Sequence, residues 1–129
     1  MDGLTPYIDI AGELDCAGLV WLPEIGDEVA ARSNLHAVSI LVDPQGMPVT
    51  ELRQTFLWLP TIEQLVNQFE ARQAIIFHAG LEMGSGAFVY KTVVQAQFGN
   101  VEATGESLRI SMGAALRYLL QRVQPDRVH

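Results

Sequence analysis

Features that would point to an oxidising or membrane environment are scarce in this sequence of 129 residues. It has one cysteine, Cys16, so no disulfide can form within the chain, and we expect a cytoplasmic protein in a reducing compartment. No apolar run is long enough to cross a bilayer, and the first ten residues lack the basic and apolar parts of a signal peptide. The sequence therefore predicts a protein that is neither secreted nor inserted in a membrane.

Basic residues are also few, and lysine occurs only at position 91. The chain has 8 Lys and Arg against 15 Asp and Glu, which gives a formal charge of −7. The acids that precede the first base, Arg32, are Asp2, Asp9, Glu13, Asp15, Glu24, Asp27 and Glu28. We expect this acidic arm, residues 1–31, to avoid nucleic acid, because phosphate binding requires Lys and Arg. It would either keep the chain soluble or dock a basic partner protein.

The tripeptide Trp-Leu-Pro occurs twice, at Trp21 and at Trp58. The second copy leads into Thr61-Ile-Glu-Gln64, a capping box, and an apolar stripe that predicts a helix to about Arg72. The first copy leads to Gly26 and crowded acids, which favour a turn and a short extended segment. A duplicated unit would keep its periodicity, and this pair does not. The two copies are therefore predicted to have different structures.

The remaining pattern predicts the elements of an α+β fold. Strands are expected at 35–43, 74–79 and 88–98, with a glycine-rich turn at 80–86 and a closing helix at 107–123. Residues 1–19 have no clean period and could be a short strand or an irregular arm. Residues 47–58 allow either a strand or a helical turn, and the strand is favoured.

Together these elements predict an antiparallel sheet with two packed helices, in which a β-hairpin is followed by an αββα core at 57–123. The whole chain, 1–129, is expected to form a single domain, since its length suits one. The residues predicted at the centre of the core are Phe69, Phe88, Tyr90, Leu116 and Leu119.

No group of residues has the pattern of a catalytic, cofactor or metal site. His36 and His78 lie in predicted strands, without a second ligand at metal-binding spacing. The glycines at 80–86 form neither a nucleophile elbow nor a dinucleotide fingerprint, because a strand rather than a helix follows them. We therefore expect no catalytic residues, no cofactor and no metal, and a binding protein is favoured over an enzyme.

The segment from Phe56 to Phe69 has an aromatic-and-proline start that leads into a helix, and Ala103-Thr104 and Ala114-Ala115-Leu116 introduce and occupy the closing helix. In this order of elements the chain resembles the αββα sandwich domain of small bacteriophage and prophage proteins of Gram-positive bacteria. The resemblance implies a phage-related origin and the αββα arrangement. It implies no reaction and assigns no functional residues.

Two functions are consistent with these observations. The first is a phage-related accessory module that binds a protein through its acidic arm. Its candidate partner-binding residues are Trp21, Glu24, Asp27 and Glu28, with Trp21 expected to be the least buried aromatic. The alternative is a structural homo-oligomer in which a sheet edge, such as that of residues 35–58, or a helix face pairs two copies. A small-molecule enzyme is the third hypothesis and would need a pocket that contains Asp27, Glu28 and a histidine.

Overall fold

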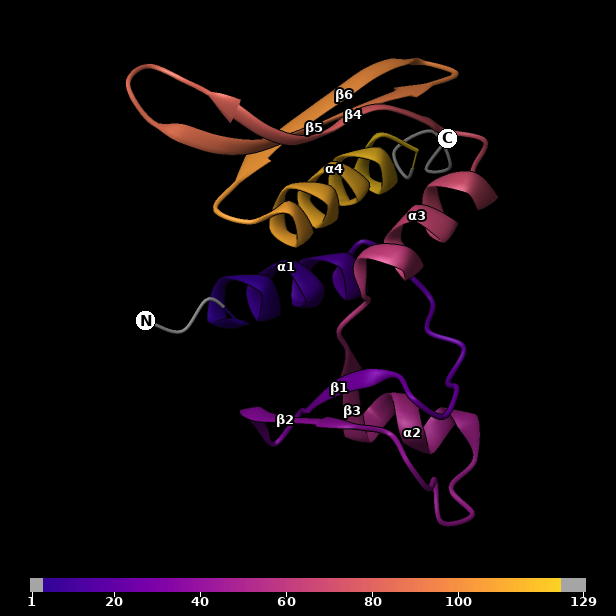
Figure 1. Cartoon of the computed structure of the whole chain (residues 1–129). Helices are drawn as coiled ribbons and strands as arrows, with labels where there is room; N and C mark the ends of the chain where they lie inside the picture. Colours follow the sequence, from indigo (N-terminus) through magenta and orange to yellow (C-terminus); the bar gives the residue numbers. More distant parts are fainter. Residues whose placement is uncertain (1–3, 124–129) are drawn as a thin grey trace. The chain divides into compact units, whose positions relative to one another are not determined.

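The computed structural model describes residues 4–123 and divides the chain into two compact units, residues 1–60 and 61–129. We call these the N-terminal unit and the C-terminal unit. Each contains helices and one three-stranded antiparallel sheet (Figure 1), which confirms the predicted α+β class. The strands of residues 28–58 pair only with one another, so they do not extend the sheet of the C-terminal unit as the sequence suggested. None of the described helices is long and apolar enough to cross a membrane.

The N-terminal unit contains two helices and a sheet of order β2–β1–β3. Its elements are α1 (Leu4–Cys16), β1 (Glu28–Ala31), β2 (Asn34–Ile40), α2 (Val49–Thr55) and β3 (Phe56–Trp58). The central strand β1 places Val29 beside Ser39 of β2 and Trp58 of β3. Strand β2 and the turn before β1 were predicted correctly. The αββα core was predicted to start at residue 57. Trp58, however, pairs with β1, and the N-terminal unit continues to Pro60, so residues 57–60 belong to the N-terminal unit.

Two segments of this unit differ from their predicted structure. Residues 4–16, expected to be a strand or an irregular arm, form helix α1. Pro6 is tolerated in the first helical turn, whereas Gly12 in the middle lowers helix propensity by about 1 kcal/mol, which obscured the pattern. Burial of Tyr7 and Leu14 outweighs that cost, and Tyr7 Oη donates a hydrogen bond of 2.7 Å to the carbonyl of Pro60.

The second difference is helix α2, which replaces most of the strand favoured at 47–58. The helix follows Pro48 and carries a single buried side chain, Leu52. One helical turn is enough to bring Leu52 onto a cluster of buried residues formed with Trp21, Val29 and Leu41. The strand then occupies only Phe56–Trp58.

In the C-terminal unit one helix precedes three consecutive strands in the sequence and a second helix follows them. Its elements are α3 (Ile62–Ala71), β4 (Ile75–Met83), β5 (Phe88–Ala96), β6 (Gly99–Gly105) and α4 (Leu108–Val123). The capping box is confirmed: Thr61 Oγ1 accepts from the backbone N–H of Gln64 at 3.2 Å, and Gln64 Oε1 accepts from that of Thr61 at 3.0 Å. Strand β6 adds a third strand to the predicted αββα order.

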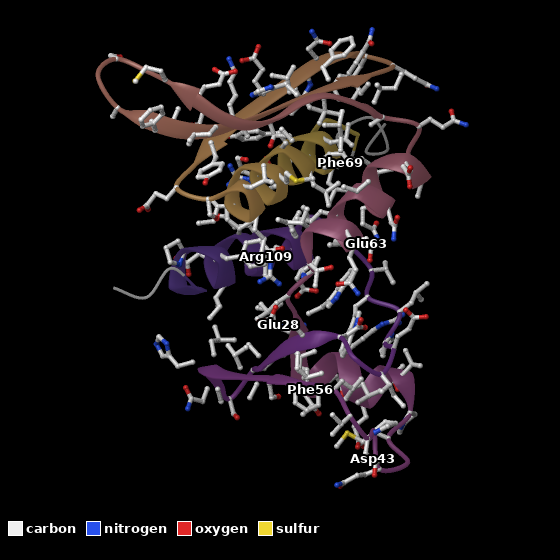
Figure 2. All side chains as sticks on the ribbon, in the orientation of Figure 1. Glu28, Asp43, Phe56, Glu63, Phe69 and Arg109 are labelled. Carbon is white, nitrogen blue, oxygen red and sulfur yellow. The ribbon has the colours of Figure 1, made fainter. Side chains whose placement is uncertain are left out.

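The predicted core of this unit is only partly correct. Phe69 of α3 (labelled in Figure 2) and Leu116 and Leu119 of α4 are buried, as expected. Phe88 is 65% exposed and Tyr90 is half-buried, so these two predictions of a core centre are wrong. The reason lies in β4, which continues to Met83 through residues expected to form a turn. The hairpin of β4 and β5 therefore extends past the start of α4, as Figure 1 shows.

Candidate functional site

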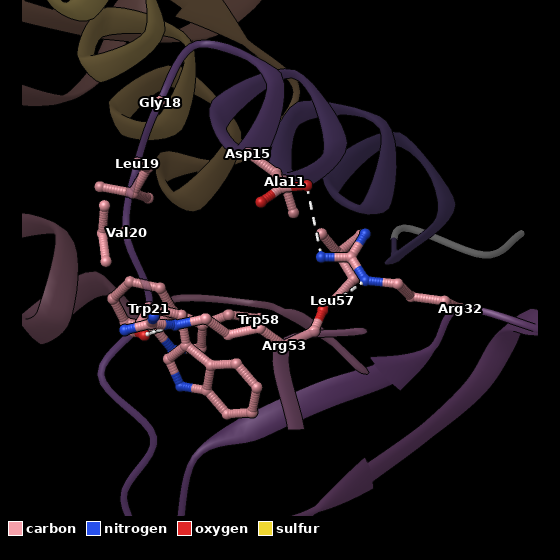
Figure 3. Close-up of a pocket in the computed structure, with 10 residues that line it drawn as sticks. All are labelled: Ala11, Asp15, Gly18, Leu19, Val20, Trp21, Arg32, Arg53, Leu57 and Trp58. Carbon is pink, nitrogen blue, oxygen red and sulfur yellow. Dashed lines mark hydrogen bonds and ion pairs between the residues drawn. The ribbon is translucent and has the colours of Figure 1, made fainter. Parts of the chain in front are cut away.

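A pocket of about 320 Å³ opens on the N-terminal unit (Figure 3). Two tryptophans, Trp21 and Trp58, line it together with two arginines, Arg32 and Arg53. The remaining lining is mainly apolar, with Leu57 among its residues and one acid, Asp15. Its volume lies at the small end of the range for ligand sites, which suits a small group rather than a folded domain.

Main-chain carbonyl groups hold both arginines in place. Arg32 follows β1, and its Nε donates to the carbonyl of Arg53 at 2.8 Å. Arg53 lies in α2, and its Nε donates to the carbonyl of Trp21 at 2.7 Å. Each guanidinium is therefore fixed through Nε, which leaves its terminal nitrogens to face other groups. A guanidinium fixed in this way presents a planar set of donors that matches a carboxylate.

The acid in the pocket neutralises one arginine only in part. Asp15 Oδ2 lies 3.3 Å from a terminal nitrogen of Arg32, as a dashed line in Figure 3 marks, and both side chains are well exposed. An exposed pair of this kind contributes about 0–1 kcal/mol, because water screens both charges. Among residues 4–123 no carboxylate pairs with Arg53. The pocket therefore has an excess of positive charge in a chain that is acidic overall.

Trp21 is held by a buried aspartate rather than exposed. Its indole Nε1 donates to Asp27 Oδ2 at 2.8 Å, and the same oxygen accepts the backbone N–H of Glu24 at 2.9 Å. Trp21 is 5% exposed and Asp27 is 4% exposed. The prediction that Trp21 is the least buried aromatic is therefore wrong. The carboxylate satisfies the indole N–H inside the unit, which removes the polar reason for the ring to stay in water.

The four predicted partner-binding residues do not share one exposed surface. Trp21 and Asp27 are buried, Glu28 is half-buried at the start of β1, and only Glu24 is exposed. A buried side chain offers little area to a partner. Of the predicted acids, Glu24 is therefore the one that a partner could reach most easily. A role of these residues in binding stays a prediction.

The acidic arm is not a continuous surface in the described chain. Asp9 and Glu13 lie four residues apart on α1 and are exposed, whereas Asp15 pairs with Arg32 and Asp27 is buried. Asp2 lies outside the described residues. The arm therefore combines a short exposed acidic stripe with acids that serve structural contacts.

Sequence reasoning did not identify Arg32, Arg53 or Trp58 as site residues. The only signal was the repeated Trp-Leu-Pro tripeptide, because both of its tryptophans line this pocket. Trp21 lies in a loop and Trp58 ends β3, so the prediction that the two copies have different structures is confirmed. The two arginines are brought to them by main-chain hydrogen bonds that no local sequence pattern encodes.

Other reactive side chains form no comparable group. Within the described range, 4–123, no three His, Cys, Asp or Glu side chains gather closely enough to hold a metal ion. Cys16 is exposed at the end of α1, and His36 is exposed on β2. His78 contacts Glu82 at 3.1 Å in the other unit. Comparison with protein-family models, curated proteins and solved structures finds no match for this chain.

Proposed function

We propose that this chain is a non-catalytic binding module that recognises a carboxylate group of a partner protein in the pocket of the N-terminal unit. The observation that carries this proposal is the pair of arginines, Arg32 and Arg53, fixed beside Trp21 and Trp58. Terminal guanidinium N–H groups are strong donors to carboxylates, and a charge-assisted hydrogen bond contributes about 1.5–3 kcal/mol.

The size and lining of the pocket favour the end of a peptide as ligand. The C-terminal carboxylate of a peptide would face the arginines, while an apolar last side chain would contact mainly Trp58, the half-buried one of the two indoles. Burial of apolar surface between such a side chain and an indole ring contributes about 25 cal/mol of binding free energy per Å² removed from water. Because the pocket is small and open, we expect a dissociation constant on the order of micromolar to millimolar rather than nanomolar.

The intrinsic fluorescence of the protein provides the assay, because its two tryptophans both line the pocket. A short peptide with an apolar last residue and a free C-terminal carboxylate should change the emission in a saturable way. The same peptide with an amidated C-terminus should bind about tenfold more weakly or worse, since it lacks the charge. A free aryl carboxylate tests whether the carboxylate alone, as in a small organic acid, is sufficient.

Arg53→Gln is the informative variant, because Gln is shorter and carries no charge. We expect it to weaken binding of the free-carboxylate peptide by about tenfold or more. Arg122→Gln, in an exposed position of α4, is the matched control and should bind as the unaltered protein does. Equal binding of the amidated and free peptides, or equal loss in both variants, would contradict the proposal. Far-UV circular dichroism confirms that each variant is folded.

A phage-related origin and a cytoplasmic location belong to the same proposal. Their support is the resemblance of residues 56–69 and 103–116 to phage αββα proteins, and the single cysteine. A gene placed away from phage structural, replication or recombination genes would count against this origin. The second candidate function, self-association, is favoured by a separate observation on strand β4.

A further inference from the structure

Strand β4 forms an unprotected edge of the sheet in the C-terminal unit. The order β4–β5–β6 leaves one side of β4 without a strand partner among the described residues. The strand has nine residues, Ile75–Met83, and contains no proline, lysine or arginine. Natural proteins commonly use these residues to prevent edge strands from pairing with another chain. The one irregularity lies between Ile76 and His78, and from His78 onward β4 pairs residue by residue with β5.

The face of the sheet next to this edge is apolar and exposed. Thr92 and Val94 of β5 are fully buried in the core, so Tyr90 and Phe88, at alternate positions, lie on the same face. Their partners on β4 are Leu81 and Met83. We call Leu81, Met83, Phe88 and Tyr90 the hairpin patch. Its side chains are 51% exposed at Leu81, 64% at Met83 and 65% at Phe88.

The opposite face of β4 carries a histidine and a glutamate placed symmetrically about Gly80. His78 and Glu82 lie two residues before and two residues after this glycine, and His78 Nε2 contacts Glu82 Oε2 at 3.1 Å across it. Beside Gly80, on β5, lies Lys91. The hydrogen bond from Lys91 to Glu102, together with attraction to Glu102 and then to Glu82, raises the pKa of Lys91.

This arrangement is self-complementary when the strand is paired with an antiparallel copy of itself. With Gly80 opposite Gly80 of the second copy, His78 lies opposite the partner's Glu82, and the reverse pair forms by symmetry. On the other face, Leu81 lies opposite the partner's Ala79. Complementary polar pairs and apolar pairs at directly opposed positions stabilise antiparallel strands.

We propose that two copies of this chain pair through their β4 strands, antiparallel and centred on Gly80, to form one continuous sheet. In this pair the two Leu81 side chains lie near the symmetry axis beside the partner's Ala79, whereas Met83 and Phe88 lie farther from the axis. A second copy is the occupant that this spacing favours, because the order His78, Gly80, Glu82 is complementary to its own reverse. The interface uses neither the pocket nor any other residue of the N-terminal unit.

Cross-linking tests this register directly. In an antiparallel pair centred on Gly80, the two Gly80 Cα atoms would lie about 4.5–5.5 Å apart, within the range that a disulfide spans. A Cβ at Gly80 meets only His78 Cε1, at 3.7 Å, so cysteine fits there. Gly80→Cys in a Cys16→Ser background should therefore give a covalent dimer on mild oxidation. Ile75→Cys in the same background is the control, because Ile75 is exposed at the start of β4 and ten residue positions along the strand, about 33 Å, would separate its two copies.

Sedimentation equilibrium and light scattering measure the association itself. The unaltered protein should be a dimer, and Leu81→Lys should be monomeric, because it places a charge in the apolar contact at an exposed position. Glu82→Lys should weaken the dimer about tenfold, because it removes the carboxylate that faces His78, and His78→Glu combined with Glu82→Lys should restore it with the two roles exchanged. A monomeric unaltered protein, a dimer indifferent to Leu81→Lys, or cross-linking as efficient through residue 75 as through residue 80 would overturn the proposal.

Discussion

The hydrogen bonds of Asp27 give the most direct test of how the N-terminal unit is held together. One buried carboxylate oxygen accepts from the indole of Trp21 and from the backbone of Glu24. Asp27→Ala removes both bonds and leaves a buried indole N–H without its acceptor. Because this oxygen joins Trp21 and Glu24 to Asp27, its loss should loosen the wall of the pocket at Trp21.

The expected magnitude follows from the two bonds and their burial. Hydrogen bonds to a charged acceptor contribute about 1.5–3 kcal/mol each, but two bonds to one oxygen are not additive. We expect Asp27→Ala to lower the free energy of unfolding of the N-terminal unit by roughly 3 kcal/mol. Asp27→Asn keeps an acceptor oxygen without the charge and should lose about half as much.

Urea denaturation monitored by tryptophan fluorescence measures this loss, because both tryptophans lie in residues 1–60. The control is Asp43→Ala, since Asp43 is exposed and its Oδ1 accepts one hydrogen bond, from the backbone of Gln45 at 2.8 Å. It should cost no more than about 1 kcal/mol. If Asp27→Ala and Asp43→Ala had equal midpoints and slopes, the reasoning from the buried carboxylate would be refuted.

Three further predictions concern the C-terminal unit. Gly105→Ala should destabilise it by about 1–3 kcal/mol, because a Cβ there would lie 2.6 Å from Ile110 Cγ2; thermal unfolding measures this. Thr92→Val should cost about 1–2 kcal/mol, since it removes the buried hydroxyl contact of 2.8 Å with Ser111. Adding Ser111→Ala should cost less than the two single effects combined, as a double-mutant cycle would show. Thr61→Ala should cost about 1 kcal/mol in urea denaturation followed by far-UV circular dichroism, because α3 loses its cap.

Control substitutions of the same type at other positions show whether the losses of stability are specific to Gly105, Thr92 and Thr61. Gly12→Ala lies in helix α1 with open space at its Cβ and should be neutral or stabilising by up to about 1 kcal/mol. Thr104→Val, at an exposed position of β6, should change stability by no more than about 0.5 kcal/mol. Thr50→Ala, inside helix α2, should be neutral or favourable, in contrast to Thr61→Ala. A substitution that behaved like its control would contradict the corresponding prediction.

Where local chemistry decides the structure, the sequence was sufficient to predict it. The capping box of Thr61 and Gln64 marks the start of α3, because its two hydrogen bonds join residues three positions apart. Helix α1 was missed because Gly12 weakens the local helix signal, and burial by residues distant in sequence determines the outcome. Phe88 was placed in the core because alternation along β5 shows which face it occupies, but not how far α4 covers that face.

The candidate site was largely beyond sequence reasoning for a similar reason. Arg32 and Arg53 are 21 residues apart, and the contact between them runs through a main-chain carbonyl, which any residue type provides. The exposure of Trp21 was predicted wrongly because its partner Asp27 had been interpreted as a surface acid. Charge alone cannot distinguish a solvated carboxylate from one that accepts buried hydrogen bonds. The hydrogen-bond donors that surround the carboxylate decide between these two states, and the fold determines which donors are near.

The hydrogen bond between Tyr7 and Pro60 joins the two ends of the N-terminal unit. It ties the first helix of the N-terminal unit to the last residue of that unit, directly before the junction with Thr61. All strand pairs of the described residues lie on one side of this junction or the other. Each of the two segments therefore contains all the described strands of its own sheet. Exchanging their order, or fusing either segment to another gene, would leave each sheet with all its strands.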